Sequence, residues 1–424
     1  MKKNYLIKKP KNKKFSKKSN NFKRNNKRFL QKGREYNIIH KNRIFILIIL
    51  LFFIFILEKY KNYIQFIFVN ITKRIIDTKY YESFENIKSR YINNTLFKPY
   101  LETINIISHT YNQNYKTLKK YKNNINICVS LNNIYVYPQL VSIESVLINC
   151  NKYKTYLTYH ILCAPDLTES SLSILKSLVY KYPLNIEIIF YNMTNNFKQL
   201  YNFRISQAAA YRLASPIIID EDRIIHLDGD TLTFKDLTKM YKLDFNTNYM
   251  IGFLDLLSEG VDYLGINSKT YINSGVILLN LEKIRNDNKT IDLFNFLNSG
   301  KKFTHQDQTI INYIFYPKIG ILPSEYVIWN FYDESDIKKY LSYLRTELNI
   351  TELAESLKNP TIIHLVLCTP KIWENKSIYN NLYTTCGQRG NCSCEKYINL
   401  WHFYANKTDY YEEIKNFIEK KNKN

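Results

Sequence analysis

Beyond about residue 125, short apolar runs alternate with segments in which apolar residues recur every three or four positions. Four runs rich in β-branched residues predict strands: 125–131, 156–163, 186–191 and 223–227. Three segments between or before them have helical spacing: 139–148, 166–180 and 204–213. Strands that alternate with helices predict an α/β fold, with a mostly parallel sheet covered by helices on both faces. Ligands bind such sheets beyond the carboxyl ends of the strands, so the loops there are the place to look for chemistry.

The most apolar stretch of the chain is residues 44–57, which contain no polar side chain. At about 1.5 Å per residue it spans about 21 Å, less than a hydrocarbon core of about 30 Å. Buried core helices and signal peptides have runs of this length too. A core helix would carry a polar stripe, however, and a signal peptide would not follow 43 other residues. Arg43 and Lys59 can reach the headgroups and extend the span, so we expect an uncleaved signal anchor.

Charge is concentrated before this apolar run. Of the net charge of +23, residues 1–43 contribute +16, which leaves the body nearly balanced and argues against a nucleic-acid partner. A basic arm that binds phosphates is the alternative, but the adjacent apolar run explains the charge better. Lys and Arg before a span predict a cytosolic N-terminus, hence a single-pass type II membrane protein with a lumenal or external body. The eight N-x-S/T acceptors all follow the span, and a short anchor suits the endoplasmic reticulum or Golgi.

All seven cysteines also follow the span, and an odd number leaves at least one thiol unpaired. Cys386, Cys392 and Cys394 are close enough in sequence to cross-link a loop near the C-terminus. Their spacing lacks C-x-x-C, which argues against a zinc site. Beyond them, residues 401–417 carry aromatic and acidic residues at helical spacing and predict one helix packed on the domain.

The segment 224–230 (IIHLDGD) carries the clearest chemistry. An apolar strand ends there in two carboxylates, Asp228 and Asp230, separated by one residue. Residues two apart in extended backbone point the same way, so both can bind one cation. Carboxylates suit Mg²⁺ or Mn²⁺, ions that commonly hold substrate phosphates. Taken alone, the D-x-D is equally well a turn that contains two acids.

Its context adds four ordered blocks between about residues 125 and 375. They are 204–213 with 222–230, then 271–281 (YINSGVILLNL), 306–312 (QDQTIIN), and 362–364 (IIH) followed by Lys371 and Trp373. In this order they resemble glycosyltransferase family 8, and the strand leading to Asn132, Asn133 and Tyr135 sits where that family begins. The resemblance implies a GT-A (Rossmann-like) fold. It also implies retaining transfer of a sugar from a nucleotide-sugar, usually a UDP-sugar, to a glycan, glycoprotein or glycolipid acceptor.

The resemblance also implies roles for single residues. Asp228, Asp230 and His364 would ligate the metal, and an imidazole among oxygen ligands favours Mn²⁺ over Mg²⁺. The other assignments are contacts to the donor. Asn132 and Tyr135 would contact the uracil, Arg212 the donor as a whole, and Lys371 the diphosphate, while the transferred sugar would be contacted by Asn273, Gln306 and Asp307.

Gln306 and Asp307 are the residues expected beside the anomeric carbon. An amide is a poor nucleophile, and Asp307 is the one carboxylate nearby in this block. We therefore expect same-face transfer to an α-linked product, with Gln306 stabilising the developing cation and Asp307 orienting the sugar hydroxyls. The alternative for Asp307 is a helix cap, where a carboxylate is favourable in any case.

The implied organisation has five parts: a basic cytosolic tail (1–43), the anchor (44–57), a partly helical stem (58–123), the glycosyltransferase domain (124–385), and a cysteine-containing loop with a C-terminal helix (386–424). The chain departs from the family pattern where His305 replaces an acid and Leu367 replaces a glycine, and Lys371 follows one residue late.

Each assignment has a structural alternative. His364 would be a core histidine, Arg212 a surface partner of Asp222, and Tyr135 an ordinary core residue. Asn273 would be turn chemistry, and Trp373 is expected to pack rather than to bind. Two other functions also remain: a metal-dependent phosphohydrolase or nucleotidyltransferase, which needs further acids or histidines for a second metal, and a non-catalytic nucleotide-sugar-binding protein.

Overall fold

The computed structural model of the protein divides into two units, Met1–Ile75 and Ile76–Asn424, and all that follows concerns the second. The structure describes residues 49, 80–111, 123–182, 185–193, 197, 207–255, 264–301, 303, 305–331, 333–335, 337–338, 349–366, 371–373 and 394–423. The expected anchor, residues 44–57, lies outside these residues except for Ile49. No helix among the described residues is long and apolar enough to cross a membrane.

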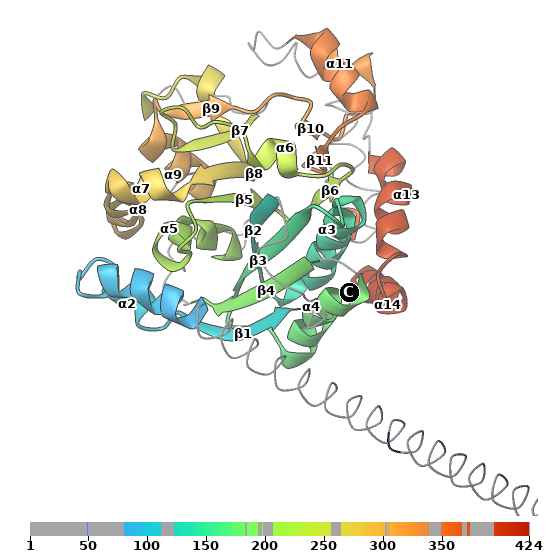
Figure 1. The fold of residues 1–424 in the computed structure, drawn as a ribbon. Coiled ribbons are helices and arrows are strands. Elements are labelled where there is room, and N and C mark those ends of the chain that lie inside the picture. Colours follow the sequence, from blue (N-terminus) through green and yellow to red (C-terminus); the bar gives the residue numbers. More distant parts are fainter. Residues whose placement is uncertain are drawn as a thin grey trace, which may run out of the picture. The chain divides into compact units, whose positions relative to one another are not determined.

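An eight-stranded sheet lies at the centre, in the order β1-β4-β3-β2-β5-β8-β7-β9 (Figure 1). Its strands are β1 Asn105–Tyr111, β2 Asn123–Leu131, β3 Thr155–Cys163, β4 Asn185–Asn192, β5 Arg223–Leu227, β7 Met250–Leu254, β8 Ile272–Asn280 and β9 Ile319–Ile321. β1 and β8 run antiparallel to their neighbours, and every other adjacent pair is parallel. This agrees with the predicted mostly parallel sheet, whose carboxyl edge collects the loops after β2, β5 and β7.

A second sheet has three strands, in the order β10 (Val327–Trp329), β11 (Ile362–His364) and β6 (Thr231–Thr233). β11 pairs with β6 in antiparallel register, so that His364 lies opposite Thr231. Because β6 follows β5 after a three-residue turn, this pairing brings the end of β11 to the carboxyl edge of the large sheet.

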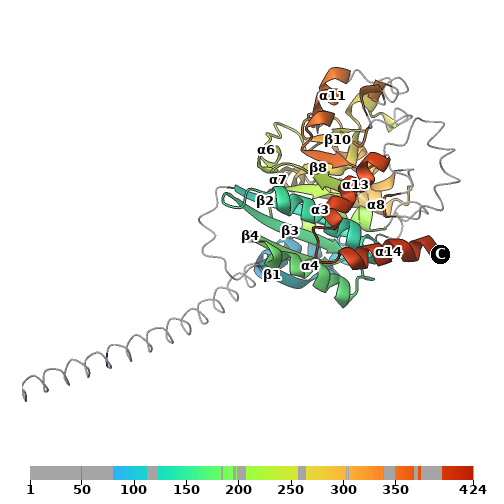
Figure 2. The same cartoon turned by 90° about the vertical axis from the view of Figure 1, so that its right-hand side faces the viewer.

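Helices cover both faces of the large sheet. The described helical elements are α2 Lys98–Leu101, η2 Asn133–Tyr135, α3 Val136–Asn149, α4 Glu169–Lys181, η4 Gln207–Ala214, α5 Ser215–Ile218, α6 Thr238–Tyr241, η6 Ser268–Thr270, α7 Leu281–Asn286, α8 Lys289–Asn298, α9 Gln306–Phe315, α11 Ile350–Lys358, α13 Cys394–Ala405 and α14 Tyr411–Lys423. One apolar core contains side chains of α3, α4, α13 and α14, and the other contains those of α5, α7, α8 and α9. Figure 2 shows α13 lying beside α3 on the first of these faces.

The four predicted strands form, each within two residues of its expected ends, and the structure adds a strand, β1, that was not predicted. β1 lies in the expected stem, yet it pairs with β4 at the edge of the sheet. The sequence of β1 is too polar to be predicted as a buried strand. One of its polar side chains, His109, is nevertheless buried, and its Nε2 lies 3.2 Å from Oε2 of the buried Glu187. A buried polar pair thus hides the strand from a hydrophobic pattern.

Two other predicted helices differ from the structure. The helix expected at 204–213 is described from Gln207 onward, where it is a 3-10 helix continued by the short α5 with a proline in its first turn. The single helix expected at 401–417 is two helices, α13 and α14. In the turn between them, the Thr408 hydroxyl donates a hydrogen bond to the carbonyl of Ala405, the last residue of α13.

Candidate active site

Three side chains proposed as metal ligands meet at the carboxyl edge of the sheet. Asp228 follows β5, Asp230 precedes β6, and His364 ends β11. One potential ligand atom from each lies within 4.8 Å of the other two. Nε2 of His364 is 3.1 Å from Oδ1 of Asp230, a contact that joins positions 134 residues apart. His364 is buried, as a core histidine would be, but it faces two carboxylates rather than apolar side chains.

Gly275 keeps open the space between these groups. It lies on β8, and its carbonyl accepts a hydrogen bond from the backbone N–H of Asp228 at 2.8 Å. A Cβ at this position would overlap the His364 imidazole, at 2.7 Å from its Nε2, and would lie 3.0 Å from Oδ2 of Asp228. Any side chain at 275 would therefore fill the point on which the two groups converge. Two carboxylates and an imidazole around such a space form a donor set that fits Mn²⁺ or a similar divalent ion.

Asp228 is held by two buried neighbours. Its Oδ1 accepts a hydrogen bond from Nη2 of Arg212 at 2.7 Å and lies 3.2 Å from Nε2 of His226. Burial acts to raise the pKa of Asp228, but the Arg212 charge and His226 outweigh it, and the pKa falls to about 2. Burial lowers the pKa of His226 to about 4, with the Arg212 charge adding to the effect. At neutral pH the pair is thus a carboxylate and a neutral imidazole.

Asp230 forms an ion pair with Lys371. Nζ of Lys371 lies 2.6 Å from its Oδ2 and 3.0 Å from the carbonyl of Leu365. Burial opposes ionisation of Asp230, but Lys371 and His364 together hold its pKa far below the usual range. Lys371, which was expected to bind the diphosphate of the donor, therefore lies within this site. Its ammonium is paired with Asp230, a carboxylate that would also bind the metal.

Asp307 also contacts the guanidinium of Arg212. Its Oδ2 is 3.2 Å from Nε of Arg212, and the side chain is 6% exposed. Burial raises the pKa of Asp307 to about 6, helped by the Asp228 charge and opposed by Arg212. Gln306 begins α9 beside it, and the side chain of Gln306 is outside what the structure describes. His305 precedes them, exposed, at the N-cap.

Two polar side chains without an assigned role, Asp255 and Gln308, join this site. Asp255 follows β7, and its Oδ2 accepts hydrogen bonds from Nδ2 of Asn273 at 3.2 Å and Nε2 of Gln308 at 2.8 Å. Oδ1 of Asn273 in turn accepts from the N–H of Gly275 at 2.9 Å, which ties this network to the metal ligands. The sequence held a signal for Asp255, because an acid follows the apolar run 250–254 just as Asp228 follows β5.

Asn132 and Tyr135 lie beyond β2 at the same edge. Oδ1 of Asn132 accepts from the N–H of Tyr135 at 3.2 Å and caps the short helix η2. The half-buried Tyr135 ring makes an edge-on contact with the buried Trp373, with centroids 6.0 Å apart. Tyr135 also faces Gly229 of the D-x-D turn, where a Cβ would lie 3.6 Å from its Cδ1. The residues expected to bind the uracil, Asn132 and Tyr135, thus lie next to the turn that carries two of the candidate metal ligands.

One structural alternative is wrong. The buried Arg212 does not pair with Asp222 on the surface; Asp222 lies 3.9 Å from Nη2 of Arg285 instead. Leu367 and the first part of the block at 204–213 lie outside the described residues.

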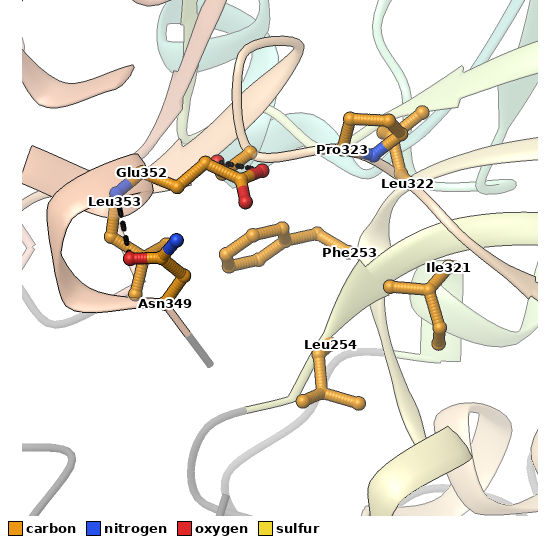
Figure 3. A pocket seen from close by; sticks show the side chains of 9 residues that line it. Phe253, Leu254, Ile321, Leu322, Pro323, Asn349, Glu352 and Leu353 are labelled. Atoms are coloured by element: carbon orange, nitrogen blue, oxygen red, sulfur yellow. Dashed lines mark hydrogen bonds between the residues drawn. The ribbon is translucent and has the colours of Figure 1, made fainter. Parts of the chain in front are cut away.

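A cavity of about 160 Å³ lies farther along the carboxyl edge, at the ends of β7 and β9. Figure 3 shows Phe253 in its lining, facing Asn349 and Glu352 of the α11 segment, with Leu254 and Ile321 nearby. None of the residues with an assigned role lines this cavity.

The model of Glycosyl transferase family 8 matches residues 107–377. The chain belongs to this family. A putative glycosyltransferase of Haemophilus influenzae is 26% identical over 213 residues, which make up 48% of this chain and 62% of that protein. The lipopolysaccharide 1,2-glucosyltransferase of Escherichia coli is 27% identical over 237 residues, 52% of this chain and 69% of that protein.

Among solved structures, the chain is similar to the apo form of the bifunctional glycosyltransferase WbbM. The TM-score is 0.56 at 17% identity, over 73% of this chain and 53% of that one. This likeness confirms the expected α/β fold of the GT-A type. The family match begins within β1, which agrees with the place of that strand in the domain.

Proposed function

We propose that this family 8 member is a retaining glycosyltransferase that moves a sugar from a UDP-sugar to a glycan, glycoprotein or glycolipid. The observation that carries the proposal is the convergence of Asp228, Asp230 and His364 on the space kept open by Gly275. A divalent cation held by these three residues would stabilise, as a Lewis acid, the negative charge of the leaving diphosphate. Mn²⁺ is the ion we favour, because one ligand is an imidazole.

The chain's own cations stand next to the same carboxylates. Arg212 contacts Asp228, and Lys371 contacts Asp230. A divalent cation held by Asp230 would offset the charge of that carboxylate, and the Lys371 ammonium would then be available to bind the diphosphate oxygens. Arg212 stays between Asp228 and Asp307, where it keeps both carboxylates in place.

In this proposal the transferred sugar lies against Asn273, Asp255 and Gln308. Their amides and carboxylate are a donor and acceptor set suited to sugar hydroxyls. Asp307 is paired with Arg212 and is almost fully buried, which supports a positioning role rather than attack on the anomeric carbon. We therefore favour same-face transfer with an α-linked product from a UDP-α-sugar. A β-linked product in the proton NMR spectrum would contradict this stereochemistry.

Release of UDP from a panel of UDP-sugars, with Mn²⁺ or with chelator, tests the proposal. We expect release that needs the metal and that falls at least about 100-fold in Asp230→Asn, because one donor-binding charge is lost. Asp222→Asn is the matched control, since Asp222 directly precedes β5, at the other end of the strand from Asp230, and is 77% exposed. UDP binding without turnover would favour a non-catalytic protein, and release of inorganic phosphate would favour a phosphohydrolase.

We also propose that the protein is membrane-anchored, with this domain in the lumen of the Golgi or endoplasmic reticulum. Four of the N-x-S/T asparagines are exposed on the described surface: Asn93, Asn288, Asn349 and Asn406. Glycosidase digestion should then raise the gel mobility of the membrane-bound protein, and replacing these four by Gln should remove most of that change. A soluble protein that digestion leaves unchanged would contradict the proposal.

A further inference from the structure

Gln139 is a buried polar side chain that hydrogen bonds do not explain. It lies on α3 and is 1% exposed. Neither Oε1 nor Nε2 has a hydrogen-bond partner in the described part of the chain. An amide that is shielded from water and left unpaired destabilises the folded protein, so such groups are rare and call for an explanation.

The neighbours of Gln139 on the same helix are paired. Oγ of Ser142 lies 2.9 Å from Oγ1 of Thr231, and Oγ of Ser145 accepts from the N–H of Thr233 at 2.9 Å. α3 thus runs along β6 with its polar side chains matched to the strand. One turn earlier on α3, Gln139 has no such partner, at the point where the helix passes Gly229 of the D-x-D turn.

Gln139 lies between the expected base contact and the metal ligands. Tyr135 is one helical turn before it, and both side chains face Gly229. A Cβ on Gly229 would lie 3.3 Å from Oε1 of Gln139 and 3.6 Å from Cδ1 of Tyr135. Gly229 itself separates Asp228 from Asp230. In a nucleoside diphosphate, the group between the base and the diphosphate is the ribose.

We propose that Gln139 is a nucleotide-binding residue that hydrogen-bonds the ribose hydroxyls of the donor. This inference rests on the proposed function, because it takes the metal ligands as the diphosphate side. An amide both donates and accepts, and so does a hydroxyl, which makes the two complementary. To contact a ribose, the buried amide would have to turn outward beside the half-buried Tyr135. The amide is unpaired in the free protein and becomes paired in the complex, so binding relieves an existing cost.

Binding of UDP, 2′-deoxy-UDP and 3′-deoxy-UDP with Mn²⁺ to the full chain, measured by calorimetry, tests this inference. We expect the wild-type protein to bind at least one deoxy analogue about fivefold more weakly than UDP. In Gln139→Met, which keeps the length of the side chain, this ratio should fall to about one. Without nucleotide, Gln139→Met should melt at or above the wild-type temperature, because no buried amide remains unpaired.

Ser145→Ala is the matched control, since it removes a paired polar group from the same face of α3. It should lower the melting temperature and leave the ratio of affinities unchanged. Gln139→Leu serves as a second variant if Gln139→Met does not fold. An unchanged ratio in the Gln139 variants, or equal loss of affinity for UDP and both analogues, would overturn the inference while the proposed function stands. A wild-type protein that binds no UDP would contradict both.

Discussion

Nη2 of Arg212 lies 2.7 Å from Oδ1 of Asp228, and the arginine side chain that makes this contact is 3% exposed. Nε of the same guanidinium lies 3.2 Å from Oδ2 of Asp307. Burial opposes the charge of Arg212, yet the two carboxylates keep its pKa above the usual value. A buried cation therefore holds a candidate metal ligand and a candidate sugar-side residue in one arrangement.

Replacing Arg212 by Met should destabilise the protein by about 3 to 5 kcal/mol, because the buried Asp307 and the half-buried Asp228 lose their positive partner. Turnover should fall as well. Arg212→Lys should restore only part of the stability and part of the turnover, since one ammonium cannot contact both Asp228 and Asp307. Calorimetric melting and UDP release measure the two effects. Arg90→Met is the control, because the Arg90 side chain is 57% exposed. Equal stability of Arg212→Met and Arg90→Met would refute this account.

Gly275→Ala should weaken metal binding strongly and lower the stability of the fold only slightly. The added methyl would displace His364 and crowd Asp228, so we expect Mn²⁺ affinity to fall at least about tenfold, as measured by titration calorimetry. Gly252→Ala is a matched control on the adjacent strand β7, where a Cβ would crowd Ile272 and lie 2.9 Å from Cγ2 of Ile277. The control should lower the melting temperature and leave metal affinity intact. The same loss of affinity in both variants would show a general effect on the sheet.

Asp307 should make stability fall as the pH rises from about 4 to 6. Its pKa of about 6 in the folded protein lies above the ordinary 3.8, so the folded state binds the proton more tightly. Stability is therefore greatest below pH 4 for this group and declines as the proton leaves, by roughly 3 kcal/mol in total. Asp307→Asn should remove that part of the decline in urea titrations across this range. Asp292→Asn, at a carboxylate that is 46% exposed, should not.

If the ionised form of Asp307 positions the sugar, turnover should rise through about pH 6. The profile of Asp307→Asn should be lower and lack this rise. A wild-type profile that is flat between pH 5 and 7 would limit Asp307 to a structural role.

His160 should make the protein sensitive to acid. Burial lowers the pKa of His160 to about 4, with His109 adding to the effect and Glu187 opposing it. Because the folded pKa lies below the ordinary 6.5, the stability present above pH 6.5 is lost as the pH falls toward 4, by up to about 3 kcal/mol. His160→Gln should flatten the melting temperature over this window, with the exposed His305→Gln as control. An unchanged acid response in His160→Gln would contradict this assignment.

Much of the fold was predictable from local patterns. β2, β3, β4 and β5 are buried runs of β-branched residues, and α3 and α4 place apolar side chains at helical spacing. The same local logic found Asp228 and Asp230, because residues two apart beyond a strand share a direction. A family resemblance supplied His364, which no local pattern links to them.

Other features depend on segments that meet only when the chain folds. Gln308 is an ordinary polar residue in the sequence, and the position of Asp255 after an apolar run does not tell which side chains it meets. Their place beside Asn273 results from the pairing of β7 with β8 and the packing of α9 on β8. The sequence did not predict β1, because its buried polar residue His109 is paired with Glu187, a partner 78 positions away.

The sequence by itself determined the alternation of strands and helices and the D-x-D at the end of β5, because both follow from the side chains of a few consecutive residues. Only the tertiary structure decided that His364 faces Asp230, that Gly275 keeps the space between the ligands open, and that Gln139 is buried without a partner. These relationships depend on the antiparallel register of β11 on β6 and on the packing of α3 against the D-x-D turn. Register and packing are settled by contacts between distant segments, which hydrophobic periodicity does not record.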